Sequence, residues 1–467
     1  MAQIVCMRPK SSAKLQNYFD MCKFICTFAA QMKRIILYSC LFLSIPVSAL
    51  PHYELAYRLS GAGGVMIPDG KVDQWVNRPV LGGEFAVEFL PTGRWHCLQQ
   101  WNNASIGVGA GYLNLGNDKI LGSAVTAYGY INMPFYNGRH FRIGARPTVG
   151  LAAVTKTYAN TYKGEHLYQD HKDANWSIGS VLNAYLALEL YMDFPIKDGW
   201  EITLNGGWHH ISNGSIMHPN AGYNMLGGEL GLRYHPHEKD YTSPDPDVPR
   251  KLYDGVDKPW AVEISATGGV KQNYYRDNYP KMQFFGAATI KAAAYWVPVS
   301  IFRIGAGVDA FYDGYYRCVS NREEYKTAFP DAPVTYFGKT YLYESSIKNC
   351  FRVGVSLQPE FIIGHLTAGI HVGFYVFDPI KNLEPFENQT DPSKQKDPNA
   401  LHPGDKPFDR GIFYNYDFSK ASNYQDGWCY MQFVLKYHVL DHLFVQIGLK
   451  THGVRAEFID AGLGVAF

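Results

Sequence analysis

The stretch that decides the fold is Leu443-Phe444-Val445-Gln446-Ile447-Gly448-Leu449-Lys450, near the end of a chain of 467 residues. Its aliphatic side chains stand at every second position, and the intervening positions include a glutamine and a lysine. A period of two is typical of a β-strand with one apolar and one more polar face. The same alternation recurs along the chain, in the stretches 141–151, 200–212, 260–267, 351–358 and 459–467. The sequence therefore predicts an all-β protein.

The composition agrees with many strands joined by turns. Hydrophobic residues make up 46% of the chain and aromatic residues 15%, and there are 45 glycines. This content is too apolar for a disordered chain and favours strands and tight turns over a helical bundle. The formal net charge is only +1, so the sequence offers no electrostatic argument for nucleic-acid binding, and we expect none.

Several features favour a membrane barrel over a soluble sandwich, whose strands alternate as well. The alternating stretches are about ten residues long, which suits a tilted membrane crossing. Tight turns such as Asn137-Gly138 alternate with long polar loops near 153–174 and 377–425, as in outer-membrane barrels. The chain ends with Phe467 on an apolar face, which resembles the C-terminal signature of bacterial outer-membrane proteins. We predict an antiparallel transmembrane outer-membrane β-barrel of about sixteen strands, with about twelve as the lower bound.

The chain divides into a leader and two halves. A basic start at Met32-Lys33-Arg34, a short apolar run and Val47-Ser48-Ala49 form the pattern of a secretory signal peptide, which indicates export to the outer membrane. We interpret the residues before Met32 as the product of a start codon placed too early, with a genuine extended leader as the alternative. The domains that we assign are a leader (1–49, signal peptide 32–49), a first half with the active site (50–240), a Pro-rich connector (241–258) and a second half (259–467). We expect one large barrel, with two eight-stranded barrels as the alternative.

Three polar side chains interrupt the apolar face of two neighbouring strands. Alternation in 200–212 places His210 and Ser212 on the face that carries Trp200, Ile202 and Leu204. Asn224 occupies the apolar face of the next strand. Polar groups that face lipid are costly unless they pair or act. We therefore predict that these three residues meet at the lipid boundary and form a catalytic set.

The residue types fit hydrolysis of an ester in a lipid. A serine hydroxyl becomes a nucleophile when a base takes its proton, and His210 is placed to take it from Ser212. Asn224 would fix the imidazole tautomer, and Asn213 with the backbone of Gly214 would hold the oxyanion. We rank His209 and His218 below His210, because alternation points the first inward and the second lies in the loop. No metal site and no cofactor are predicted.

These residues resemble a known family. His210-Ile211-Ser212-Asn213, followed by Pro219-Asn220-Ala221-Gly222-Tyr223-Asn224, is similar to the motif of the lipid A 3-O-deacylase family (PagL), the acyloxyacyl hydrolase-like proteins of the outer membrane. The resemblance covers at most residues 50–240. It implies a small barrel that removes an ester-linked acyl chain from lipid A, with His210 as base, Ser212 as nucleophile and Asn213 as oxyanion donor. The family usually has Glu where this chain has Asn224.

The asparagine supports a second resemblance. Outer-membrane phospholipase A uses a His-x-Ser-Asn-Gly motif with Asn as third member, and the stretch from His210 to Gly214 together with Asn224 fits that pattern. The phospholipase is calcium-dependent, but Met217 stands here at the position of its acidic calcium ligand, so we do not expect a calcium requirement.

We therefore predict an outer-membrane serine esterase that acts on lipid A or lipopolysaccharide. The alternatives are an outer-membrane phospholipase A, whose substrate would be phospholipid, and a channel or adhesive barrel without chemistry. The sequence is also compatible with a homodimer.

Overall fold

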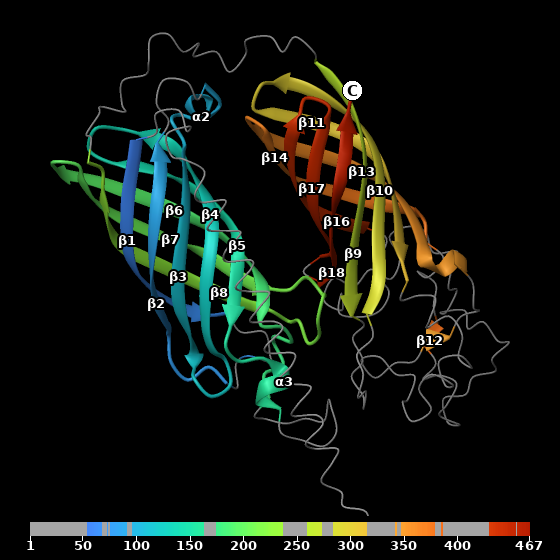
Figure 1. Ribbon diagram of the computed structural model, residues 1–467, viewed down its shortest axis with the longest axis horizontal. Helices are drawn as coiled ribbons and strands as arrows, with labels where there is room; N and C mark the ends of the chain where they lie inside the picture. The colour runs from blue at the N-terminus through green and yellow to red at the C-terminus, as the bar shows by residue number, and fades with distance from the viewer. Residues whose placement is uncertain are drawn as a thin grey trace, which may run out of the picture. The chain divides into compact units, whose positions relative to one another are not determined.

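The computed structural model describes residues 54–67, 72, 75–90, 96–162, 174–236, 259–272, 284–314, 341–342, 347–378, 384–385, 429–453 and 455–467. Sixteen strands of these segments form two closed antiparallel barrels of eight strands each. In Figure 1 the first barrel runs from blue to green and the second from yellow to red. The all-β class and the predicted number of strands are therefore confirmed. Among the described residues, no helix is long and apolar enough to span a membrane.

The first barrel contains strands β1 to β8. Their bounds are β1 (Glu54–Met66), β2 (Val80–Leu90), β3 (Ser105–Asn117), β4 (Gly122–Asn137), β5 (Arg142–Val154), β6 (Leu182–Lys197), β7 (Trp200–Ser212) and β8 (Tyr223–Tyr234). Two short helices, α2 (His96–Gln100) and α3 (Tyr158–Thr161), lie in its connections. The barrel closes because β1 pairs with β8, in a register that runs from Tyr57 opposite Tyr234 to Met66 opposite Met225.

The second barrel contains the remaining long strands. Their bounds are β9 (Trp260–Gln272), β10 (Phe284–Val299), β11 (Phe302–Asp313), β13 (Phe351–Ile363), β14 (Leu366–Phe377), β16 (Cys429–Leu440), β17 (Leu443–His452) and β18 (Arg455–Ala466). A 3-10 turn, η2 (Ile347–Cys350), precedes β13, and the two-residue strands β12 (Tyr341–Leu342) and β15 (Glu384–Pro385) pair with each other. This barrel closes where β18 pairs with β9, for example Leu463 opposite Ala266.

The expectation of one large barrel is therefore wrong, and the alternative of two eight-stranded barrels is confirmed. In a single large barrel β8 would pair with β9. Instead, β8 pairs with β1 and β9 pairs with β18, so each half closes on itself. The predicted leader (1–49) and the connector (241–258) lie outside the described residues.

Both barrels are polar inside and apolar outside. Aliphatic and aromatic side chains face outward and remain exposed, as Leu188 (58%) and Leu230 (64%) do in the first barrel. Charged side chains instead fill the lumen and pair there. Arg233 donates from Nε to Glu88 Oε2 at 2.7 Å and from Nη1 to Glu201 Oε2 at 2.6 Å. This inverted polarity is that of a barrel whose outer surface meets lipid.

The lumen of the second barrel is filled in the same manner. Lys436 Nζ lies 2.6 Å from Glu263 and 2.7 Å from Glu360, and Arg303 contacts the same two carboxylates at 2.6 Å each. An eight-stranded barrel is just wide enough for side chains to fill, so these pairs occupy the interior. The charges are stabilised because each one has an oppositely charged partner.

In the first barrel, an apolar cluster extends from the strands into the connections at one end. We call this the loop end; it is the end at which β7 passes into β8. Part of the cluster comes from the connections and the adjacent strand ends, namely Val72, Trp75, Leu115, Leu121, Val154, Ile178, Ile211 and Tyr223. The β7–β8 connection therefore rests on a packed base.

Candidate active site

Strand pairing brings the three predicted polar residues together at the loop end of β7 and β8. His210 lies opposite Asn224, and Ser212 lies two residues beyond His210 on the same face. His210 Nδ1 is 2.8 Å from Asn224 Oδ1, and His210 Nε2 is 2.8 Å from Ser212 Oγ. The three side chains thus form one continuous hydrogen-bonded chain on the outer wall of the barrel.

The hydrogen bonds define which ring nitrogen of His210 carries the proton. Because an amide oxygen only accepts, Asn224 Oδ1 requires a proton on His210 Nδ1. The other ring nitrogen, Nε2, is then free of a proton and accepts from the Ser212 hydroxyl. This is the tautomer that a base needs in order to take a proton from serine.

The imidazole ring is held on both sides. The indole of Trp208 stacks on His210, with ring centroids 5.3 Å apart and an interplanar angle of 16°. Gly222 approaches from the β7–β8 connection, and a Cβ built on it would lie 2.9 Å from His210 Cε1 and 3.2 Å from Ser212 Cβ. Its φ of +77° is also a conformation that favours glycine. Glycine is therefore required at 222 by both its backbone and the ring beside it.

The β7–β8 connection (213–222) is folded around the side chain of Asn213. Asn213 Nδ2 donates to Ser180 Oγ at 2.7 Å and to the Met217 carbonyl at 2.8 Å, and Oδ1 accepts from the Met217 N–H at 3.2 Å. Both amide protons of Asn213 are thus used, one by Met217 in the connection and one by Ser180 in the segment before β6. In this structure the Asn213 side chain, which we predicted to hold an oxyanion, links the connection to that segment.

Two other donors lie in the same connection. The Asn213 N–H donates to Asn220 Oδ1 at 2.9 Å, which fixes the Asn220 side chain against the residue that follows Ser212. Within the described part of the chain, neither the Asn220 amide nitrogen nor the Gly214 N–H donates a hydrogen bond to the protein. Gly214 has a φ of +61°. The sequence reasoning did not assign a role to Asn220, although it lies in the Pro219-Asn220-Ala221-Gly222 stretch that carried the resemblance.

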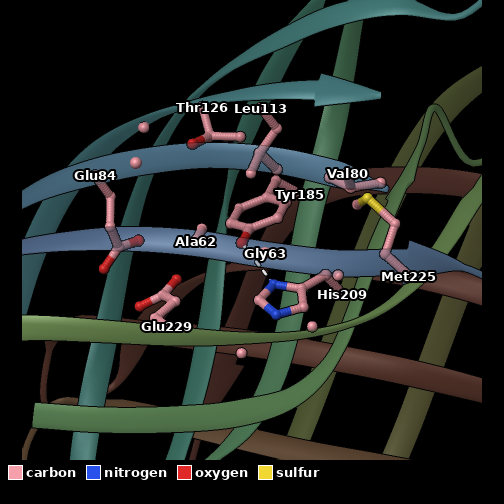
Figure 2. Close-up of a pocket in the computed structure, with 15 residues that line it drawn as sticks. Ala62, Gly63, Val80, Glu84, Leu113, Thr126, Tyr185, His209, Met225 and Glu229 are labelled. Carbon is pink, nitrogen blue, oxygen red and sulfur yellow. Dashed lines mark hydrogen bonds between the residues drawn. The ribbon is translucent and has the colours of Figure 1, made fainter. Parts of the chain in front are cut away.

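His209, one of the two competing histidines, and Glu229 lie on the other side of the wall. Figure 2 shows His209 and Glu229 lining a cavity in the lumen with Tyr185, Glu84 and Met225. His209 Nδ1 is 2.9 Å from the Tyr185 hydroxyl, and Glu229 accepts from Asn205 Nδ2 at 2.9 Å. The strand separates these groups from Ser212. Among the described residues, no cluster of three or more His, Cys, Asp or Glu side chains is arranged to hold a metal ion.

The fold and the side chains together define a class of protein: a β-barrel with an apolar outer wall that carries a hydrogen-bonded Ser, His and Asn at one end. Residues 85–233 match the family model of lipid A 3-O-deacylase (PagL), and residues 260–387 and 412–467 match that of the acyloxyacyl hydrolase C-terminal domain. The chain belongs to this lipid A deacylase and acyloxyacyl hydrolase family, and thus to hydrolases that act on lipid A esters. The predicted family and outer-membrane location are confirmed.

Three solved structures to which the chain is similar are the following. The outer membrane enzyme PagL is 15% identical, and the match covers 38% of this chain and 98% of that one with a TM-score of 0.25. Neisserial surface protein A is 13% identical over 39% of this chain and 96% of that one, with a TM-score of 0.24. An outer membrane channel from Pseudomonas putida is 8% identical over 90% and 96%, with a TM-score of 0.16. No curated protein matches the chain.

Proposed function

We propose that this protein is a serine esterase that removes an ester-linked acyl chain from lipid A in the outer membrane. The observation that carries the proposal is the hydrogen-bonded chain from Asn224 through His210 to Ser212 on the lipid-facing wall. The membership of the lipid A deacylase family supports the substrate class.

The geometry supports a two-step acyl transfer. Ser212 Oγ attacks the ester carbonyl while its proton passes to His210 Nε2, and Asn224 holds the opposite ring N–H. His210 then returns the proton to the departing sugar oxygen as the C–O bond breaks, which leaves an acyl-serine. Water, deprotonated by the same nitrogen, hydrolyses the acyl-serine and releases a fatty acid.

We assign the oxyanion of the intermediate to donors of the β7–β8 connection. The Gly214 N–H and the Asn220 side-chain amide nitrogen are available, whereas the Asn213 amide protons are donated to Ser180 and to the Met217 carbonyl. Asn213 thus contributes by shaping the connection that presents Gly214. Such donors act on charge that develops only during the reaction, so they accelerate the chemical step.

The wall beside the site suits an acyl chain. Leu188 and Leu226 lie opposite Trp208 on the two neighbouring strands, and all three side chains are exposed on the outer surface. A lipid substrate can place its acyl chain against this apolar surface while its ester reaches Ser212 at the loop end.

An outer-membrane phospholipase is the second candidate. The observation that favours it is the third member of the catalytic set, which is Asn224 rather than a carboxylate. A channel is disfavoured, because buried ion pairs fill both lumens in the described part of the chain.

Mass spectrometry of the lipids of cells that express the wild type or Ser212→Ala tests the proposal. We expect lipid A that lacks one ester-linked hydroxyacyl chain, and no such species with the variant. Lysophospholipid in place of deacylated lipid A would show that the protein is a phospholipase. Unchanged lipids in both classes would refute both assignments.

A further inference from the structure

A short segment between α3 and β6 lies against the β7–β8 connection, and we call it the clamp (174–181). Ile178 forms an antiparallel bridge with Asn220, and the Gly222 N–H donates to the Ser177 carbonyl at 2.9 Å. A Cβ on Gly179 would lie 2.5 Å from the His218 carbonyl oxygen, so glycine allows the two chains to approach closely. The clamp is thus paired to the loop that presents the proposed oxyanion donors.

One arm of the clamp fixes the orientation of Asn213. Asn183, in β6, donates from Nδ2 to the Ser180 and Val181 carbonyls at 2.9 and 3.1 Å. Its Oδ1 therefore faces the Ser180 hydroxyl, which donates to it at 2.8 Å. The Ser180 oxygen is then left to accept from Asn213 Nδ2 at 2.7 Å. Each hydrogen bond from Asn183 through Ser180 to Asn213 therefore has only one possible donor, so the Asn213 amide has one orientation.

The other arm holds the start of β8. Asn175 is fully buried and donates from Nδ2 to the Tyr223 hydroxyl at 2.6 Å and to the Lys156 carbonyl at 2.9 Å. Its Oδ1 accepts from the Ser177 N–H at 3.1 Å. Tyr223 immediately precedes Asn224, just as Asn213 immediately follows Ser212. The clamp thus holds the two residues that flank the catalytic set in the chain.

We propose that the clamp sets the geometry of the catalytic set, and that Ser180 is a positioning residue that acts through Asn213. This inference rests on the proposed esterase function. Small displacements of reacting groups have large effects on rate, since a shift of about 1 Å can cost about 100-fold. Loss of one orienting hydrogen bond corresponds to about a ten-fold decrease in rate. We therefore expect Ser180→Ala to lower kcat about ten-fold and to leave KM unchanged, because the apolar wall is intact.

The chain offers a matched control in the same segment. Ser177 is fully buried, and its hydroxyl has no hydrogen-bond partner in the described part of the chain. It acts in the clamp through its carbonyl, which Ser177→Ala retains. This variant makes the same chemical change as Ser180→Ala without removing an acceptor, so its kcat should equal that of the wild type. Ser180→Thr, which keeps the hydroxyl, should restore most of the lost rate.

Kinetics on the full-length protein in vesicles with purified lipid A test the coupling to Asn213. If Ser180 acts through Asn213, the double variant Ser180→Ala/Asn213→Ala should be no slower than Asn213→Ala alone. Losses that multiply, or a Ser180→Ala rate equal to that of Ser177→Ala, would overturn the inference. Retention of the folded barrel is checked by the shift in gel mobility on heating.

A second measurement does not depend on activity. Hydrogen exchange of the peptide that spans 213–222 should become faster in Ser180→Ala and stay unchanged in Ser177→Ala. Equal exchange in the two variants would overturn the clamp. If the wild type released no acyl chain while the exchange difference was present, the esterase function would fail and the clamp would stand.

Discussion

Replacement of Asn224 by aspartate tests the proposed role of the third member directly. Asp is isosteric with Asn, so Asn224→Asp should keep the 2.8 Å contact with His210 Nδ1 while adding a negative charge. A hydrogen bond to a charged group contributes about 1.5–3 kcal/mol, against about 0.5–1.5 kcal/mol for a neutral one. The midpoints of these ranges differ by about 1.3 kcal/mol, which corresponds to about nine-fold in rate.

The gain should appear in kcat, because the imidazolium that the carboxylate stabilises forms only during the reaction. Initial rates of acyl release from lipid A in vesicles, at a pH well above the usual carboxyl pKa, measure it. Asn137→Asp, at the opposite end of the barrel, adds the same charge far from the site and should leave the rate unchanged. An Asn224→Asp enzyme no faster than the wild type would refute the reasoning about His210. It would mean that the cost of a carboxylate at the lipid boundary outweighs its pairing.

Three further changes test the surroundings of the set. Gly222→Ala places a methyl against the imidazole and strains a φ of +77°, so kcat should fall about ten-fold or more. Gly61→Ala is the control: its new methyl would have no neighbour closer than 4.0 Å, so kcat should be unchanged in the same assay. Asn220→Ala should lower kcat about 100-fold with little change in KM if its amide binds the oxyanion; an unchanged kcat would remove it from that role. Trp208→Asp should reduce the yield of folded barrel more than His209→Asp, because a charge on the lipid face is destabilising whereas the lumen already holds charged side chains; equal yields in membranes would contradict the assigned faces.

Local patterns allowed the strands to be predicted, as well as the meeting of His210, Ser212 and Asn224 on one face. Alternation in 200–212 separated His210 from His209 by face, and the structure places the first on the outer wall and the second in the lumen. A period of two is a property of each strand alone, and for that reason a sequence can reveal it.

The closure of the barrels could not be predicted in this way. Pairing of β1 with β8 joins residues that are far apart in the sequence, such as Tyr57 and Tyr234, and both a large barrel and two small ones have the same alternation. The use of Asn213 was missed for a related reason. Its partner Ser180 lies 33 residues earlier, between the polar loop near 153–174 and β6, and no local pattern links the two residues.

The position of Ser212 on the outer wall has a consequence for enzyme kinetics. A substrate already dissolved in the leaflet reaches the serine by lateral diffusion, so the encounter takes place in two dimensions. The quantity that sets the rate is then the mole fraction of substrate among the surrounding lipids, not its concentration in the buffer. Adding inert lipid at constant total substrate should therefore slow the enzyme, as dilution with water slows a soluble one.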